Sequence, residues 1–224
     1  MAFLNKPTIN KNVKYFLTEV LIVVLGILFA LQLNNWNESV HLKAEEEKAL
    51  KLLVNELKMD RYIMSYSKQK LKNSSKYLTK ISEGKIDDIS LDSILINLEN
   101  EYVHQKMNSA YLNLKYEGKL NIIDNDELKN ELISFYEAYY SGHEALTISH
   151  TTFSYNILRP YILKELPIHL NKMIDESIVR EKLKDPILMN LINFQITKYN
   201  LISGHIDLER VDTLIKIIQE ELNN

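Results

Sequence analysis

The chain has 224 residues with 27 Lys or Arg and 30 Asp or Glu, giving a net charge of −3. This balance provides no general attraction to nucleic acid, so a nucleic-acid partner is not expected. The chain has no cysteine, which excludes disulfide bonds and cysteine metal sites. Only five glycines and four prolines interrupt it, and so few helix breakers favour long helices joined by few turns.

Residues 15–36 predict one membrane-spanning helix. Residues 20–31 contain no charged or polar side chain. At about 1.5 Å per residue the segment spans roughly 32 Å, close to the thickness of a bilayer's hydrocarbon layer. Tyr15 and Phe16 at one end and Trp36 at the other are the aromatic anchors typical of membrane interfaces. No second apolar run of about 18 residues occurs, so a single span is expected.

A cleaved signal peptide is the alternative for this region, because both begin with a basic stretch followed by an apolar run. No clean small-x-small cleavage site occurs near Ala30, which favours an uncleaved anchor. Residues 1–14 form a short polar tail with three lysines and no acidic residue, whereas the lysines beyond the span are mixed with glutamates. The positive-inside rule therefore predicts an inner-membrane protein with a cytoplasmic N-terminus and a periplasmic domain at 37–224.

One face of the span carries an ionisable side chain, Glu19, which is costly inside an apolar stretch. At about 100° per residue, Gly26 and Ala30 lie within about 20° of Glu19 around the helix. Two interpretations stay open: neighbouring spans meet here and bury Glu19, or Glu19 reaches the cytoplasmic interface. An ion pathway is a weaker third, because the span offers no relay partner. The predicted packing face consists of Glu19, Ile22, Val23, Gly26, Ala30 and Leu33.

The sequence after the span keeps helical periodicity to about Ser82, without proline or glycine. Leucine or methionine recurs at every seventh position, but the companion positions hold Asp60, Ser67 and Ser74, which spoil a two-stranded zipper. We therefore expect a long helix, continuous with the span, that packs on other helices and ends at Gly84. The seventh-position residues are Leu50, Leu57, Met64, Leu71 and Leu78.

Turn and cap signals divide the next part of the chain. Ser90 is a candidate N-cap for a short helix, and residues 101–108 look irregular. A second short helix is predicted to begin at Asn108 or Ser109. It ends at Gly118, which can adopt the left-handed conformation favoured at a helix C-terminus.

A longer helix is predicted to start at Asp124 or Asn125. Its apolar pattern reaches Leu158 before Pro160, with a bend expected at Gly142.

A break at Pro167 precedes the last predicted helix. Asp185 followed by Pro186 reads as an N-cap and a first helical residue, and the helix is expected to run unbroken to 222. Its apolar stripe passes through Phe194 or Gln195.

Two patterns could carry chemistry, but each has a structural explanation that we prefer. His143 and His150 lie seven residues apart on one helix face near Tyr139, yet no acidic residue follows in a metal-ligand spacing. Two S-x-x-K matches, at 65–68 and 67–70, lack the S-D-N and K-T-G elements of serine acyl enzymes. We therefore predict no catalytic residue, metal or cofactor.

A cluster of tyrosines follows helical spacing, which is typical of core or interface positions with the hydroxyl at a wet edge. A stacking platform for a sugar or a base is the alternative. The cluster consists of Tyr136, Tyr139, Tyr140 and Tyr155.

The stretches TEVLIVVLGILFALQLNNWNE at 18–38 and NSAYLNLKYEGKLNIIDNDELKNELISFY at 108–136 are the most distinctive in the chain. Together they resemble a bacterial domain-of-unknown-function family of single-span envelope proteins. One departure is Lys129, where the family has arginine more often. The resemblance implies an envelope protein without an assigned activity, so no catalytic residue carries over. The matching positions are Glu19, Gln32, Trp36, Asn37, Glu38, Ser109, Ala110, Tyr111, Leu114, Lys115, Gly118 and Tyr136.

These expectations combine into an all-α protein with one N-terminal transmembrane helix continuing into a long helix, followed by an extracytoplasmic helical bundle. The expected function is a membrane-anchored, non-enzymatic assembly or scaffold subunit of the bacterial cell envelope. Its expected partners are the lipid bilayer and either further copies of itself or other membrane proteins. The alternative is an extracytoplasmic ligand-binding or sensory module acting through a membrane partner.

Overall fold

The computed structural model describes residues 11–85, 90–103, 105–166 and 176–223. Every regular element in these ranges is helical, which confirms the predicted all-α class. The elements are α1 (Lys11–Ser82), α2 (Leu91–Leu98), α3 (Ser109–Tyr116), the 3₁₀ turn η1 (Leu120–Ile122), α4 (Asp126–Ile133), the π-helical turn η2 (Ser134–Tyr139), α5 (Tyr140–Phe153), the π-helical turn η3 (Ser154–Leu158), α6 (Arg159–Glu165), α7 (Glu176–Lys182), α8 (Pro186–His205) and α9 (Leu208–Glu221).

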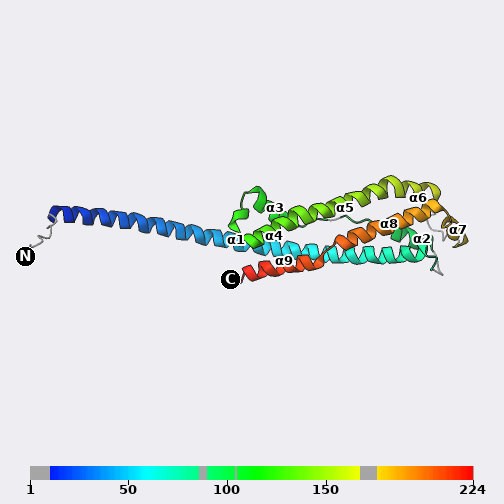
Figure 1. The fold of residues 1–224 in the computed structure, drawn as a ribbon, viewed down its shortest axis with the longest axis horizontal. Coiled ribbons are helices and arrows are strands. Elements are labelled where there is room, and N and C mark those ends of the chain that lie inside the picture. Colours follow the sequence, from blue (N-terminus) through cyan, green and yellow to red (C-terminus); the bar gives the residue numbers. More distant parts are fainter. Residues whose placement is uncertain (1–10, 86–89, 104, 167–175, 224) are drawn as a thin grey trace, which may run out of the picture. The chain divides into compact units, whose positions relative to one another are not determined.

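The chain divides into two units, Met1–Lys48 and Ala49–Asn224. The described part of the first unit is the beginning of α1, blue in Figure 1. Every side chain of residues 15–36 is exposed, and this stretch is long and apolar enough to cross a membrane. A helix satisfies its own backbone hydrogen bonds, which is what a bilayer requires of a spanning segment. The structure thus contains the expected candidate span.

Several helix ends in the second unit follow the predicted caps. The side chains of Ser90, Asn125 and Asp185 each accept a hydrogen bond from a backbone N–H in the first turn of α2, α4 and α8. Gly84 and Gly118 follow α1 and α3 with φ of 66° and 69°, the left-handed conformation that glycine adopts without strain. These predictions are confirmed. The sequence indicated these helix ends because each cap acts within about one turn of its own helix.

The second unit buries a hydrophobic core along α1. The five seventh-position residues of α1 are all buried, at 0–2 % exposed. In the second unit, α1 runs antiparallel to α8 and α9. Arg61 of α1 pairs with Asp212 of α9, whereas Ser75, further along α1, bonds Asn200 of the preceding helix α8. α5 packs against α8 and α4 against α9 (Figure 1).

The helix that begins at Asp126 continues beyond Pro160 to Glu165, so the predicted stop was wrong. A proline ring normally collides with the carbonyl four residues earlier. Here the π-helical turn η3 precedes Pro160 and is wider than an α turn, which relieves that collision. Gly142, where a bend was expected, lies within α5, and the π-helical turn η2 lies just before that helix.

The predicted last helix is two helices, α8 and α9, so the expectation of one unbroken helix was wrong. Asp207 causes the break. Its side chain accepts a hydrogen bond from Arg210 N at 3.0 Å and caps α9, while its own N–H donates to Tyr139 Oη at 3.0 Å. The second bond comes from a residue 68 positions earlier, which a local reading of the sequence does not detect.

Candidate functional site

The predicted packing face of the span lies on α1 in the first unit. Glu19, Gly26 and Ala30 are exposed, and a Cβ added at Gly26 would meet nothing within 4 Å. The face is therefore open in the isolated chain. The same exposure holds for its other members, Ile22, Val23 and Leu33, and for the interface anchors Tyr15, Phe16 and Trp36.

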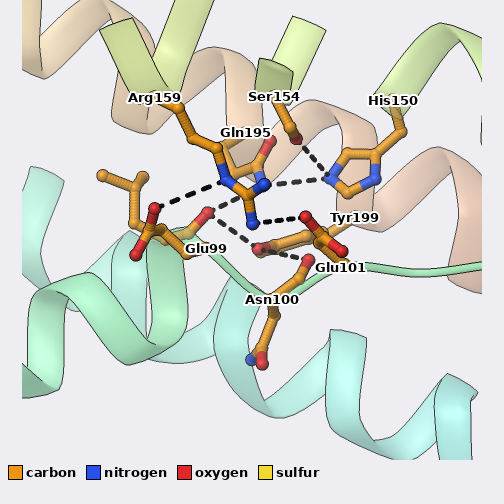
Figure 2. Close-up of polar contacts among 9 residues, drawn as sticks. Glu99, Asn100, Glu101, His150, Ser154, Arg159, Gln195 and Tyr199 are labelled. Atoms are coloured by element: carbon orange, nitrogen blue, oxygen red, sulfur yellow. Dashed lines mark hydrogen bonds and ion pairs between the residues drawn. The ribbon is translucent and has the colours of Figure 1, made fainter. Parts of the chain in front are cut away.

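In the second unit, the described residues between α2 and α3, 99–103 and 105–108, form no helix, and we call them the linker segment. Its backbone groups cannot bond one another as helical groups do, so they need other partners. Two buried side chains of α8 reach the carbonyl groups at the end of α2 and the start of the linker segment. Gln195 Nε2 donates to the carbonyl of Leu98 at 2.9 Å, and the hydroxyl of Tyr199 lies close to three carbonyl oxygens (Figure 2). The hydroxyl of Tyr199 lies 2.9, 3.1 and 3.0 Å from the carbonyl oxygens of Asn97, Leu98 and Asn100.

We call the group of polar contacts around Gln195 and Tyr199 the first polar centre, and His150 belongs to it. Its Nε2 is 3.0 Å from Gln195 Nε2, which can only donate, so His150 Nε2 accepts this bond (Figure 2). The hydroxyl of Ser154, the first residue of η3, is 3.4 Å from the same nitrogen. Burial lowers the pKa of His150, and the positive charge of Lys198 lowers it further. His150 is therefore held neutral and structural.

Arg159 closes the first polar centre at its outer edge. Its guanidinium lies 3.6 Å from a Glu99 carboxylate oxygen and makes a shorter ion pair with Glu101, so it joins α6 to the linker segment (Figure 2). It also lies over the ring of Tyr155, 4.3 Å from the centroid, and Tyr155 itself is 49 % exposed. Because these groups reach solvent, the ion pairs are worth little by themselves.

A second polar centre surrounds Asp60, which is fully buried on α1. The hydroxyl of Tyr140 donates to its carboxylate. Burial raises the pKa of Asp60 to about 6; the bond from Tyr140 opposes this, and the charge of Glu56 adds to it. The ring of Tyr136 lies 5.2 Å from that of Tyr140 and stacks on Tyr111 at 4.4 Å. Burial thus holds the pKa of the Asp60 carboxyl above its usual range.

His143 lies in the same region, also fully buried. Its Nε2 is hydrogen-bonded to the hydroxyl of Tyr102 on the linker segment. The ring of His205 on α8 lies 5.2 Å away and stacks on Tyr139 at 5.1 Å. A Cβ at Gly142 would come within 3.2 Å of the His205 ring, so glycine permits this close contact between α5 and α8.

The residues singled out for chemistry therefore have separate surroundings. His143 and His150 belong to different polar centres, and within the described ranges no group of three or more His, Asp or Glu could hold a metal ion. Tyr136, Tyr139 and Tyr140 are buried, as expected for core aromatics.

Lys68, the lysine of one S-x-x-K match, is partly buried, and its Nζ donates to the carbonyl of Ile206 at 2.5 Å. It stabilises the end of α8.

A groove of about 430 Å³ lies between α4 and α9. Arg210 lines this groove. It donates a hydrogen bond to Ser134 Oγ at 2.8 Å, and its guanidinium lies 5.4 Å from the ring centroid of Tyr139. The acidic residues that line the groove are Glu127, Glu131, Asp207 and Glu209.

Sequence reasoning did not find the two polar centres, although signals for them were present. Asp60 appeared only as an interruption of the seven-residue repeat, and Gln195 only as an alternative to Phe194 on an apolar stripe. The structure buries Gln195 and leaves Phe194 47 % exposed. A polar residue at a core position of an otherwise regular helix is the common signal, because burial of a polar group requires a specific partner.

Comparison with protein-family models, with curated proteins and with solved structures finds no match to this chain. The resemblance to single-span envelope proteins therefore stays a prediction.

Proposed function

We propose that this chain is a membrane-anchored, non-enzymatic assembly or scaffold subunit of the bacterial cell envelope. The observation that supports this most directly is the stretch of residues 15–36, an unbroken and fully exposed helix whose central residues, 20–31, carry no polar side chain. Water disfavours such a surface, whereas a bilayer or a neighbouring apolar helix accommodates it.

The proposed contact is the stripe around Glu19, Gly26 and Ala30. Association of helices in a membrane relies on close packing, which small residues allow. The open space at Gly26 leaves room for the backbone of a second span. A neighbouring span would also remove Glu19 from lipid, which is the costly environment for a carboxyl group.

The proposed topology places the N-terminus in the cytoplasm and the second unit, as a helical bundle, in the periplasm. Its support is the lysine-rich, acid-free tail before the span. Fusions of alkaline phosphatase and of green fluorescent protein to the C-terminus test it. Only the phosphatase fusion should be active, and fluorescence from the other fusion instead would reverse the orientation.

Cysteine crosslinking tests the association, because the natural chain has no cysteine. In the full chain in membranes, Ala30→Cys should form a disulfide-linked dimer, whereas Leu28→Cys, about 180° from Glu19 around the helix, should not. Adding Gly26→Ile should weaken the Ala30→Cys crosslink, and adding Val24→Ile on the other side should leave it unchanged. Equal crosslinking from both faces would contradict the proposed stripe.

A different membrane protein could occupy the stripe in place of a second copy. Purification from membranes in mild detergent distinguishes the two. Companions retained by the natural chain but lost with Gly26→Ile would identify a heteromeric contact. If neither a crosslink nor a Gly26-dependent companion is found, the scaffold function is wrong.

A further inference from the structure

Asp60 is a buried acid at a junction of several elements in the second unit. The hydroxyl of Tyr140 bonds its carboxylate, and the charge of Glu56, one turn earlier on α1, acts on it. The titratable or charged groups around this junction are Glu56 on α1, Tyr102 on the linker segment, Tyr111 and Lys115 on α3, Tyr136, Glu137 and Tyr139 on η2, Tyr140 and His143 on α5, His205 on α8 and Arg210 on α9.

Helix α3 docks onto this junction through its N-terminal end. The N-cap residue Asn108 makes no side-chain cap bond. Instead, the carboxylate of Glu56 accepts from the backbone N–H of Ala110, with its two oxygens at 3.0 and 2.9 Å. The start of α3 is therefore capped by a residue 54 positions earlier, on α1.

A continuous line of contacts connects this cap to Asp60. Tyr111 of α3 stacks on Tyr136, with 4.4 Å between ring centroids and 14° between ring planes. Tyr136 packs edge-on against Tyr140, whose hydroxyl bonds Asp60. Tyr111 and Ala110 are 1 % and 7 % exposed, so α3 separates this part of the junction from water.

We propose that Asp60 is a proton-dependent switch for the docking of α3: the neutral carboxyl group keeps α3 docked on α1, and ionisation of Asp60 favours its release. This inference concerns the second unit alone and does not depend on the proposed scaffold function.

The physical reason is that two carboxylates would then lie one helical turn apart in a poorly hydrated site. Like charges at this spacing repel, and burial disfavours the charged form of Asp60. Water entering the site would relieve both costs, and it can enter when α3 moves away and frees Glu56. Because burial raises the pKa of Asp60 to about 6, the change falls within the range between pH 5 and pH 7.5 in which it can be measured.

Thiol labelling of the full chain in detergent tests the switch. Ala110→Cys introduces a buried reporter, and Asn113→Cys introduces an exposed reporter on the same helix. At each pH the labelling rate of Ala110→Cys is divided by that of Asn113→Cys. This ratio removes the pH dependence that comes from ionisation of the thiol itself. We expect this ratio to rise about tenfold as pH increases from 5 to 7.5, with a midpoint near 6, corresponding to about one pKa unit of coupling.

Two further variants determine whether Asp60 is responsible. Asp60→Asn cannot ionise, so the ratio should stay low at every pH. Tyr140→Phe removes the hydrogen bond that lowers the pKa of Asp60, so the midpoint should move to higher pH. The proposal would be overturned if the labelling ratio did not change with pH in the chain that keeps Asp60 and Tyr140. It would also be overturned if Tyr140→Phe moved the midpoint to lower pH. If Asp60→Asn fails to fold, Tyr140→Phe alone decides; if it folds and keeps the pH step, the proposal is wrong.

Discussion

Leu25 and Leu52 are almost equally exposed, at 50 % and 49 %, yet they belong to units with opposite surfaces. In residues 15–36 most of the exposed side chains are apolar, whereas the second unit buries a large apolar core and exposes apolar side chains only in part. The first pattern suits a solvent of lipid and the second suits water. The free-energy cost of exposing a side chain depends on whether it faces lipid or water. The exposed fraction alone therefore does not describe a position.

The second unit also buries polar side chains, and it does so with specific partners. Asp60 bonds Tyr140, and Gln195 bonds the carbonyl of Leu98 and His150. A buried polar group without such a partner costs free energy, so these contacts fix which helices and segments lie together. The following predictions test the contrast between the two units.

The largest expected effect comes from placing a lysine at the two matched leucines. Leu25→Lys puts a charge near the middle of the span and should cost about 3 kcal/mol of membrane insertion. Leu52→Lys should cost less than about 0.5 kcal/mol of unfolding free energy, as is usual for exposed positions in water. Carbonate extraction of membranes measures the retained chain. Equal retention of both variants would show that residues 15–36 do not face lipid.

A second test concerns the buried charge of Asp60. Its pKa is about 6 in the folded protein and near 3.8 when unfolded, so the folded state binds more protons between these values. The contribution of Asp60 to the free energy of unfolding is therefore fully present below about pH 4 and is lost as pH rises through 6. The loss amounts to at most about 3 kcal/mol. Urea unfolding of the full chain in detergent, followed by circular dichroism, measures it. Asp60→Asn should flatten this pH dependence, and an unchanged slope would contradict the assignment.

A smaller effect is expected at the first polar centre. Tyr199→Phe removes the hydroxyl that serves the carbonyls at the start of the linker segment and should cost about 2 kcal/mol of unfolding free energy. Tyr155→Phe is the matched control, since Tyr155 is half exposed and its ring can still lie under Arg159. Thermal unfolding compares the two variants. Similar melting temperatures would mean that water replaces the Tyr199 hydroxyl.

The smallest predicted effects come from two glycines that differ in backbone conformation. Gly118 has a φ of 69°, so Gly118→Ala should destabilise the protein by about 1 kcal/mol. Gly204 lies inside α8 with open space where a Cβ would be, so Gly204→Ala should stabilise it by up to about 1 kcal/mol. Changes of the same sign in urea unfolding would contradict this difference.

The sequence allowed good prediction where the cause of a structure is local. Ser90, Asn125 and Asp185 cap their helices through bonds to backbone groups two or three residues ahead, and Gly84 ends α1 through its own conformation. The span and the buried seventh positions of α1 also follow from periodicity and composition, which extend over many residues.

Features set by distant partners could not be predicted in this way. The break before Asp207 depends on Tyr139, and the cap of α3 depends on Glu56. The π-helical turn η3 before Pro160 was also not predicted, and Pro160 alone gave the opposite expectation. The hydrogen bonds between elements in the polar centres join residues far apart in the chain, from 41 positions for Tyr102 and His143 to 102 for Asn97 and Tyr199.

The turns η2 and η3 each accommodate one residue more than an α-helical turn would. One consequence concerns deletions. Removing a single residue from η2 or η3 would turn the π-helical turn into an ordinary α-helical one, so the residues after it would keep nearly the same direction around the helix. Removing a single residue from regular α5 would instead rotate everything after it by about 100° and carry His150 away from its partners. Loss of one codon should therefore be tolerated better in η2 or η3 than in the α-helical stretch between them.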